Sequence, residues 1–165
     1  MNKSKFFGMT LLLAVSVSLA AQEKMSKEQR KLEMQKQTEE MVKTTTFVFA
    51  AQTAYPQGGT SVDLSMDNYT VEYSPELIKS ELPYYGKAYG GVAYGGGGGI
   101  RFTAKPGEYE TEQTKKGYII KTEVREASDT YTLTLTVGTE GSASLAINCN
   151  NRSPITFTGD IKPKK

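Results

Sequence analysis

The segment from Thr130 to Cys149 has a strict two-residue periodicity, and this feature constrains the fold more than any other. Apolar side chains occupy alternate positions, and in the first half of the segment the residues between them are threonines. One face of the segment is therefore apolar and the other polar. Gly138 to Gly141 forms a turn, after which the alternation resumes. The pattern predicts an antiparallel hairpin with one buried face. The predicted inward-facing side chains are Tyr131, Leu133, Leu135, Val137, Ala143, Leu145, Ile147 and Cys149.

The same period of two recurs from Thr44 onward, in short runs separated by turn residues. A charged hairpin lies among them, with acids along 108–112 and mixed charges along 121–125 on its outward face. Eight to ten short strands at close spacing predict an all-β domain, an antiparallel β-sandwich or flattened barrel with one N-terminal α-helix. Further inward-facing residues are expected at Phe47, Phe49, Ala51, Val71, Tyr73, Ile120, Val124, Ile155 and Phe157.

The first 43 residues fall into two parts. Lys3 and Lys5 precede a short apolar run that ends in small residues, a pattern typical of a cleavable signal peptide over residues 1–21. Residues 22–43 are almost all helix formers and are expected to form one helix, which leads into a single β domain over 44–165. A narrow stripe of Met and Leu on this helix leaves open either a solvated helix or a coiled-coil dimer. No transmembrane span is expected in the mature chain, and the predicted location is periplasmic or secreted.

The composition excludes several classes of function. The chain has no His and one Cys, so the commonest general base, the usual metal ligand and a disulfide framework are missing. No metal and no cofactor are expected. Loss of Lys3 and Lys5 would leave 18 basic and 18 acidic residues in the mature chain. A net charge near zero argues against a nucleic-acid-binding protein.

The segment from Leu82 to Gly99 departs from the rest in composition. It holds four of the ten tyrosines and eight of the sixteen glycines. Tyrosine rings offer a flat face and a hydroxyl, as sugar and peptide sites often do, so a ligand surface is one interpretation. The alternative is that some of these tyrosines cap the core beneath a glycine-rich loop. The candidate ligand-binding residues are Tyr84, Tyr85, Tyr89, Tyr94 and Arg101.

Other polar residues have simpler interpretations. Four acids close in sequence could supply paired carboxylates for glycoside hydrolysis, but turns favour Asp for backbone reasons. Arg152 stands in a turn before the last strand, where it could hold a loop carbonyl or a carboxylate. Cys149 has inward parity and is expected to be a buried, inert thiol. The four acids are Asp63, Asp67, Glu72 and Glu76.

Several blocks of the sequence together carry a family resemblance. The most specific are Leu82-Pro83-Tyr84-Tyr85-Gly86 and the ending from Arg152 to Gly159, with Gly99-Ile100-Arg101-Phe102 between them. The series resembles the domain of unknown function 4251 (DUF4251) family, small exported proteins of Gram-negative bacteria, over roughly residues 33–161. Many members resemble lipoproteins. This chain has no lipobox Cys, so the resemblance does not imply membrane tethering. It implies no established activity either.

These observations favour an exported, non-enzymatic binding or interaction module. Its partner would be a small molecule, a glycan or an envelope protein, but not a nucleic acid. Two alternatives stay open. One is a carboxylate-dependent glycan hydrolase, which needs two acids facing one cleft. The other is a structural or assembly partner in the cell envelope that uses sheet edges or the helix stripe.

Overall fold

The structure is a computed structural model, and it describes residues 26–87, 98–126 and 129–164. A helix over residues 26–44 precedes the strands. The expected signal peptide lies outside the described residues. The strands are β1 (Phe47–Pro56), β2 (Val62–Asp63), β3 (Thr70–Tyr73), β4 (Ile78–Leu82), β5 (Ile100–Ala104), β6 (Glu110–Thr114), β7 (Gly117–Glu126), β8 (Asp129–Gly138), β9 (Ser142–Cys149) and β10 (Arg152–Pro163).

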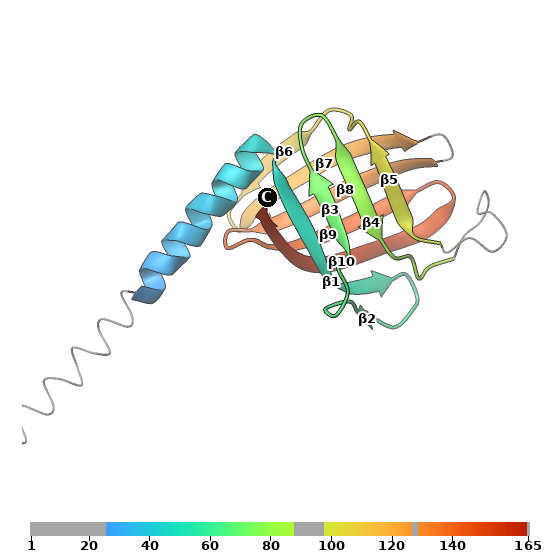
Figure 1. The fold of residues 1–165 in the computed structure, drawn as a ribbon, viewed down its shortest axis with the longest axis horizontal. Coiled ribbons are helices and arrows are strands. Elements are labelled where there is room, and N and C mark those ends of the chain that lie inside the picture. The colour runs from blue at the N-terminus through green and yellow to red at the C-terminus, as the bar shows by residue number, and fades with distance from the viewer. Residues whose placement is uncertain (1–25, 88–97, 127–128, 165) are drawn as a thin grey trace, which may run out of the picture.

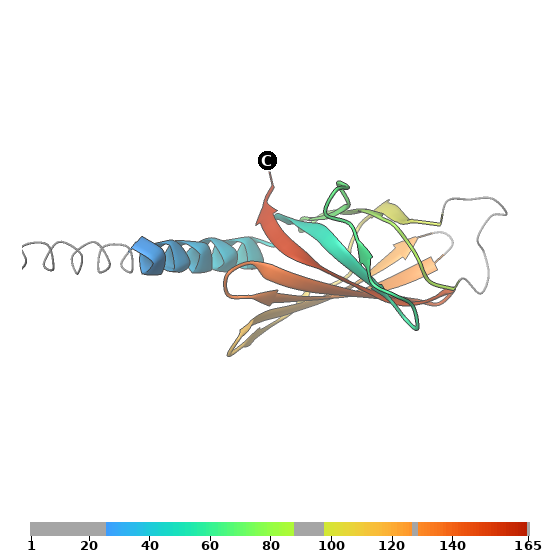
Figure 2. The ribbon, with the colours of Figure 1, turned by 90° about the horizontal axis from the view of Figure 1, so that it is seen from below.

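All strand pairings are antiparallel, and they join the strands into one sheet. The order is β5-β4-β3-β1-β10-β9-β8-β7-β6, with β2 paired to β1. The first long strand therefore pairs with the last, where Phe47 lies opposite Pro163. The sheet curls into an open half-barrel, so that β3 to β5 pass in front of β7 to β9 (Figures 1 and 2). The predicted all-β antiparallel fold with one helix is confirmed, in its flattened-barrel form.

The apolar faces of the curled sheet meet inside it and form the core. In β8 and β9 the predicted alternation is confirmed, since Leu133, Leu135, Val137 and Leu145 are all buried. Cys149, at the end of β9, is half-buried, and burial raises the pKa of its thiol. The last strand runs past Gly159 to Pro163 and is longer than the pattern indicated, because its end is covered by the start of β1.

The chain that leaves β5 contacts β7 across the opening of the curled sheet. Pro106 forms a bridge with Val124 of β7, and the amide of Gly107 donates to the carbonyl of Glu123 at 2.8 Å. Inside, the ring of Phe102 from β5 stacks on the ring of Tyr131 from β8 with centroids 4.9 Å apart. These contacts hold β5 over the interior and leave its outer face, with that of β4 and β3, exposed.

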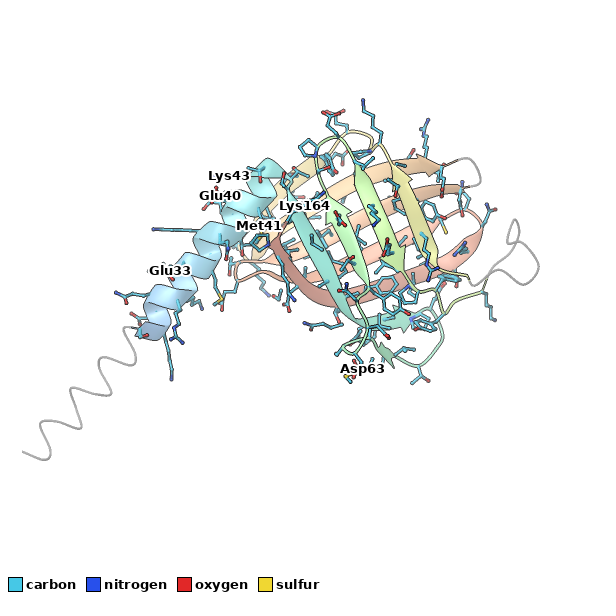
Figure 3. All side chains as sticks on the ribbon, viewed as in Figure 1. Glu33, Glu40, Met41, Lys43, Asp63 and Lys164 are labelled. Atoms are coloured by element: carbon cyan, nitrogen blue, oxygen red, sulfur yellow. The ribbon has the colours of Figure 1, made fainter. Side chains whose placement is uncertain are left out.

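The helix packs on the core through its last turns and projects away from the sheet (Figures 1 and 2). Met41 and Val42 are buried in the core, whereas Leu32 and Met34 are 56% and 42% exposed. Figure 3 shows Met41 at the junction with the sheet. Lys31 forms an ion pair of 2.9 Å with Glu140 in the β8–β9 turn. Of the Met and Leu residues in the expected stripe, Met41 thus lies in the core, whereas Leu32 and Met34 are exposed to solvent.

The helix ends in a Schellman motif. The amide of Thr46 donates to the carbonyl of Met41, and the amide of Thr45 donates to that of Val42. The motif requires a left-handed residue after the helix, and Thr45 takes this conformation with φ of 48°. A β-branched residue is strained there, where glycine is the usual choice.

Candidate functional site

A groove of about 510 Å³ crosses the outer face of β4 and β5 and reaches the residues that precede β3. This volume lies within the range of small-molecule sites in proteins. In Figure 1, β3, β4 and β5 lie in front of β7, β8 and β9. Its lining residues are Asn68, Tyr69, Lys79, Ser80, Glu81, Arg101, Phe102 and Thr103.

Strand alternation places the charged side chains of the groove on the outer face. In β4 the residues Ile78, Ser80 and Leu82 are buried, so Lys79 and Glu81 between them are exposed. In β5 the residues Ile100 and Phe102 are buried, and Arg101 between them is exposed. The Ser80 hydroxyl donates to the carbonyl of Ile100 at 2.8 Å, which adds a side-chain link between the two strands.

Charges of alternating sign run across the outer face from β10 to β5. Lys164 lies 3.1 Å from Glu72 of β3, and Glu72 is opposite Lys79 of β4. Lys79 in turn lies 2.7 Å from Glu81, and Glu81 is opposite Arg101 of β5. We call these five residues the charge ladder. It contains three cations and two carboxylates, and Arg101 is its last member.

Both carboxylates of the charge ladder are already bound in ion pairs with lysines. The hydrogen bond and charge of Lys79, and then the charge of Arg101, lower the pKa of Glu81. Glu81 raises the pKa of Lys79 in return. Among the described residues, none forms an ion pair with Arg101, because the carboxylate opposite it is held by Lys79. The Arg101 guanidinium therefore presents its donors to solvent and to the groove.

Tyr85 lies near Tyr69, which lines the groove, but it is not itself one of the lining residues. Its side chain is 44% exposed. Partial burial raises the pKa of the Tyr85 phenol, and the neighbouring Tyr69 and Asp67 act in the same direction. Of the residues expected to bind a ligand, Arg101 thus lines the groove, and Tyr85 lies near one of its lining residues.

Tyr84, in contrast, uses its hydroxyl within the protein. The hydroxyl oxygen lies 2.9 Å from each of three oxygens, namely the carbonyls of Lys87 and Ser153 and the Ser153 hydroxyl. The Lys87 amide also donates to the Ser153 hydroxyl, and the Ser153 amide donates to the Lys87 carbonyl. The side chain of Tyr84 packs partly against the core. This is the arrangement expected of a tyrosine that caps the core.

Arg152 holds the chain just before β5. Its guanidinium donates to the carbonyls of Gly98 and Gly99 at 3.1 and 2.9 Å, and it lies 5.1 Å from the centre of the Tyr84 ring. The expectation that Arg152 holds a loop carbonyl is confirmed. Two consecutive residues of β10, Arg152 and Ser153, therefore fasten the chain at 98–99 and at 87. We call Tyr84, Lys87, Arg152 and Ser153 the clamp.

The other candidate ligand residues, Tyr89 and Tyr94, lie outside the described residues. Sequence reasoning assigned Arg101 and Tyr85 but missed Lys79 and Glu81 as groove residues. A signal for both was present, because each is a charged residue at an outward position of a strand whose neighbours are apolar or small.

The acids considered for hydrolysis have other roles. The Asp63 carboxylate accepts the Ser65 amide at 2.8 Å within a turn, and hydrogen bonding from the Ser65 side chain and then from this amide lowers the pKa of Asp63. Figure 3 shows Asp63 beside β2 and Lys164, the partner of Glu72, towards the helix end of the sheet. The described lining of the groove has Glu81 as its single carboxylate. Within the described parts of the chain, no cluster of three potential metal ligands occurs.

Comparison with known proteins identifies the family. The sequence profile of DUF4251, a domain of unknown function, matches residues 29–161. The chain belongs to the DUF4251 family. A solved structure of a DUF4251 protein from Bacteroides eggerthii superimposes with a TM-score of 0.61 at 18% identity, covering 79% of this chain and 87% of that chain. At this identity the likeness concerns the fold. No curated protein matches the chain.

The clamp joins the two distant blocks of this DUF4251 protein that carried the family resemblance. Tyr84 and Gly86 come from the first block, and Arg152 and Ser153 come from the second. The fold brings them together where β10 begins. No helix in the described ranges has the length and apolarity needed to cross a membrane.

Proposed function

We propose that this DUF4251 protein is an exported, non-enzymatic binding module whose ligand occupies the outer groove of β4 and β5. The observation that supports this most is the Arg101 guanidinium, which lines the groove and has no ion-pair partner among the residues that the structure describes. Tyr85 and Asn68 add an aromatic ring and an amide at one end. Convergent polar groups beside an exposed aromatic ring are typical of specific ligand sites.

Export rests on the N-terminal sequence. Basic residues at Lys3 and Lys5, the apolar run after them and the small residues Ser18 and Ala20 form the pattern that signal peptidases recognise. The proposed location is therefore the periplasm or the medium.

Binding is favoured over catalysis by the chemistry of the groove. Glycoside hydrolysis by paired carboxylates needs two acids, and Glu81 is the one acid among the described lining residues. The sequence supplies no His as a general base. The half-buried thiol of Cys149 has a raised pKa, which reduces its thiolate fraction.

A glycan is the class of ligand that the groove fits best. The groove lies on the face of the sheet, whereas an extended peptide that recognises main-chain groups would pair with the free edge of β5, the outermost strand. Recognition on the face itself uses side chains, and a guanidinium, an amide and a tyrosine ring suit the hydroxyls and faces of sugars.

The proposal is tested by screening the purified protein against an array of acidic and neutral glycans. We expect binding that is lost in Arg101→Gln and kept in Arg125→Gln, a control that removes an exposed arginine from the outer face of β7. Thermal unfolding of each variant without ligand verifies that the fold is intact. Glycan binding that survives Arg101→Gln, or an array without any hit, contradicts the proposal.

A further inference from the structure

The charge ladder has an unequal number of cations and carboxylates, and the surplus lies at its end. Glu72 and Glu81 each bind a lysine, through the 3.1 Å contact of Lys164 and the 2.7 Å contact of Lys79. Arg101 of β5 is opposite Glu81 of β4, but Glu81 already forms an ion pair with Lys79. The described part of the ladder thus ends in one uncompensated positive charge at the groove.

We infer that the ligand is an acidic glycan and that Arg101 binds the carboxylate of one of its sugars. This inference rests on the proposed function and specifies its ligand. A sugar carboxylate beside Arg101 would continue the alternation of charge by one step beyond the sheet. Arginine suits this role because its planar guanidinium can donate two parallel hydrogen bonds to one carboxylate.

The surroundings of Arg101 support a bound carboxylate in preference to a neutral group. Lys79 and Thr103 are opposite each other in β4 and β5, next to the pair of Glu81 and Arg101. Lys79 lies within the same groove and adds a second positive charge near the ligand. Glu81 is the one acid of the described lining, and its charge is offset by Lys79. The groove as described has two cations and one carboxylate.

Tyr85 and Asn68 contribute specificity for the sugar rather than for its charge. Asn68 lines the groove beside Tyr69, and Tyr85, which is 44% exposed, lies near Tyr69. A pyranose ring can pack on an exposed tyrosine while its hydroxyls meet an amide. A carboxylate without a sugar should therefore bind less well than an acidic sugar.

The test compares two ligands that differ only in charge. Oligogalacturonate carries one carboxylate on each sugar, and its fully methyl-esterified form has the same rings without the charge. Titration calorimetry with the whole protein would measure both. We expect the acid to bind about tenfold or more tightly than the ester, because hydrogen bonds to a charged group contribute more than neutral ones. Binding of the acid should also weaken as salt is raised.

Variants separate the role of Arg101 from the fold. In Arg101→Gln we expect the acid and the ester to bind equally weakly, whereas Arg125→Gln should retain the full preference for the acid. Equal binding of acid and ester to the unaltered protein overturns the acidic-glycan inference and leaves the binding function standing. A preference for the acid that persists in Arg101→Gln overturns the assignment to Arg101. Absence of binding to every glycan overturns both proposals.

Discussion

The hydroxyl of Tyr84 lies 2.9 Å from both the carbonyl oxygen and the hydroxyl of Ser153, although the two residues are 69 positions apart. This contact joins the chain after β4 to the start of β10. Arg152 binds the carbonyls of Gly98 and Gly99. Together the two contacts hold the chain where it leaves the sheet after β4 and where it returns just before β5. The clamp stabilises the fold, and the neighbouring groove presents Arg101.

Removal of the Tyr84 hydroxyl should weaken the clamp. Tyr84→Phe leaves the buried Ser153 hydroxyl with one partner fewer, which we expect to lower the free energy of unfolding by about 1–2 kcal/mol. Tyr85→Phe is the matched control, since Tyr85 is exposed, and it should change stability little. Urea unfolding would measure both. Equal stability of the two variants would show that the Tyr84 contacts contribute nothing.

Gly86 should tolerate no side chain, because the clamp closes around it. A Cβ at this position would lie 2.5 Å from the Ser153 hydroxyl oxygen and closer still to the Tyr84 hydroxyl. We expect Gly86→Ala to destabilise the protein by about 1–3 kcal/mol through overpacking. Gly98→Ala is the control, since a Cβ there has no neighbour within 4 Å. A harmless Gly86→Ala would show that the clamp is looser than described.

Most of the strand architecture could be predicted from local pattern. The alternation from Tyr131 to Val137 identifies both the strand and its buried face, because side chains of a strand alternate strictly. Local pattern does not specify which strands pair. The pairing of β1 with β10 joins residues more than a hundred positions apart, and it follows from closing the core rather than from either strand alone.

The candidate site was only partly predictable for the same reason. The role of Arg152 could be predicted because a charged residue in a turn has few available partners. The groove could not, since Asn68, Lys79 and Arg101 become neighbours only when β3, β4 and β5 pair. Composition indicated the tyrosines between Leu82 and Gly99, yet residues 79–81 of β4 and 101–103 of β5 form most of the groove.

Thr45 offers a stabilising substitution. Its φ of 48° strains a β-branched residue, so Thr45→Gly should raise the free energy of unfolding by about 1 kcal/mol. Thr46→Gly, one residue later and with an ordinary backbone conformation, should instead lower it through the entropy of the unfolded chain. Thermal unfolding distinguishes the two. A loss of stability in both variants would mean that the Schellman motif does not persist in solution.

Stability should fall at alkaline pH through Tyr109. Its hydroxyl donates to the carbonyl of Ser74 at 2.8 Å, and burial raises its pKa to about 12. In the unfolded chain the phenol of Tyr109 ionises near pH 10. The stabilisation that Tyr109 provides is therefore complete below about pH 10 and is lost as pH rises towards 12.

Tyr109→Phe tests this dependence. The variant should be less stable at pH 8, because the bond to Ser74 is gone, but its stability should fall less steeply between pH 10 and 12. Urea midpoints measured across this range would show the difference. Parallel curves for the two proteins would exclude Tyr109 as the titrating group.

The central claim is that the outer groove of β4 and β5 is the binding site, and an NMR titration tests it most directly. Oligogalacturonate would be added to the ¹⁵N-labelled protein while backbone amide shifts are followed. We predict that the largest changes fall at residues 68–69, 79–81 and 101–103, with the Arg101 Nε–H shifted as well. Changes confined to the outer face of β7 to β9, or no changes at saturating ligand, would contradict the account.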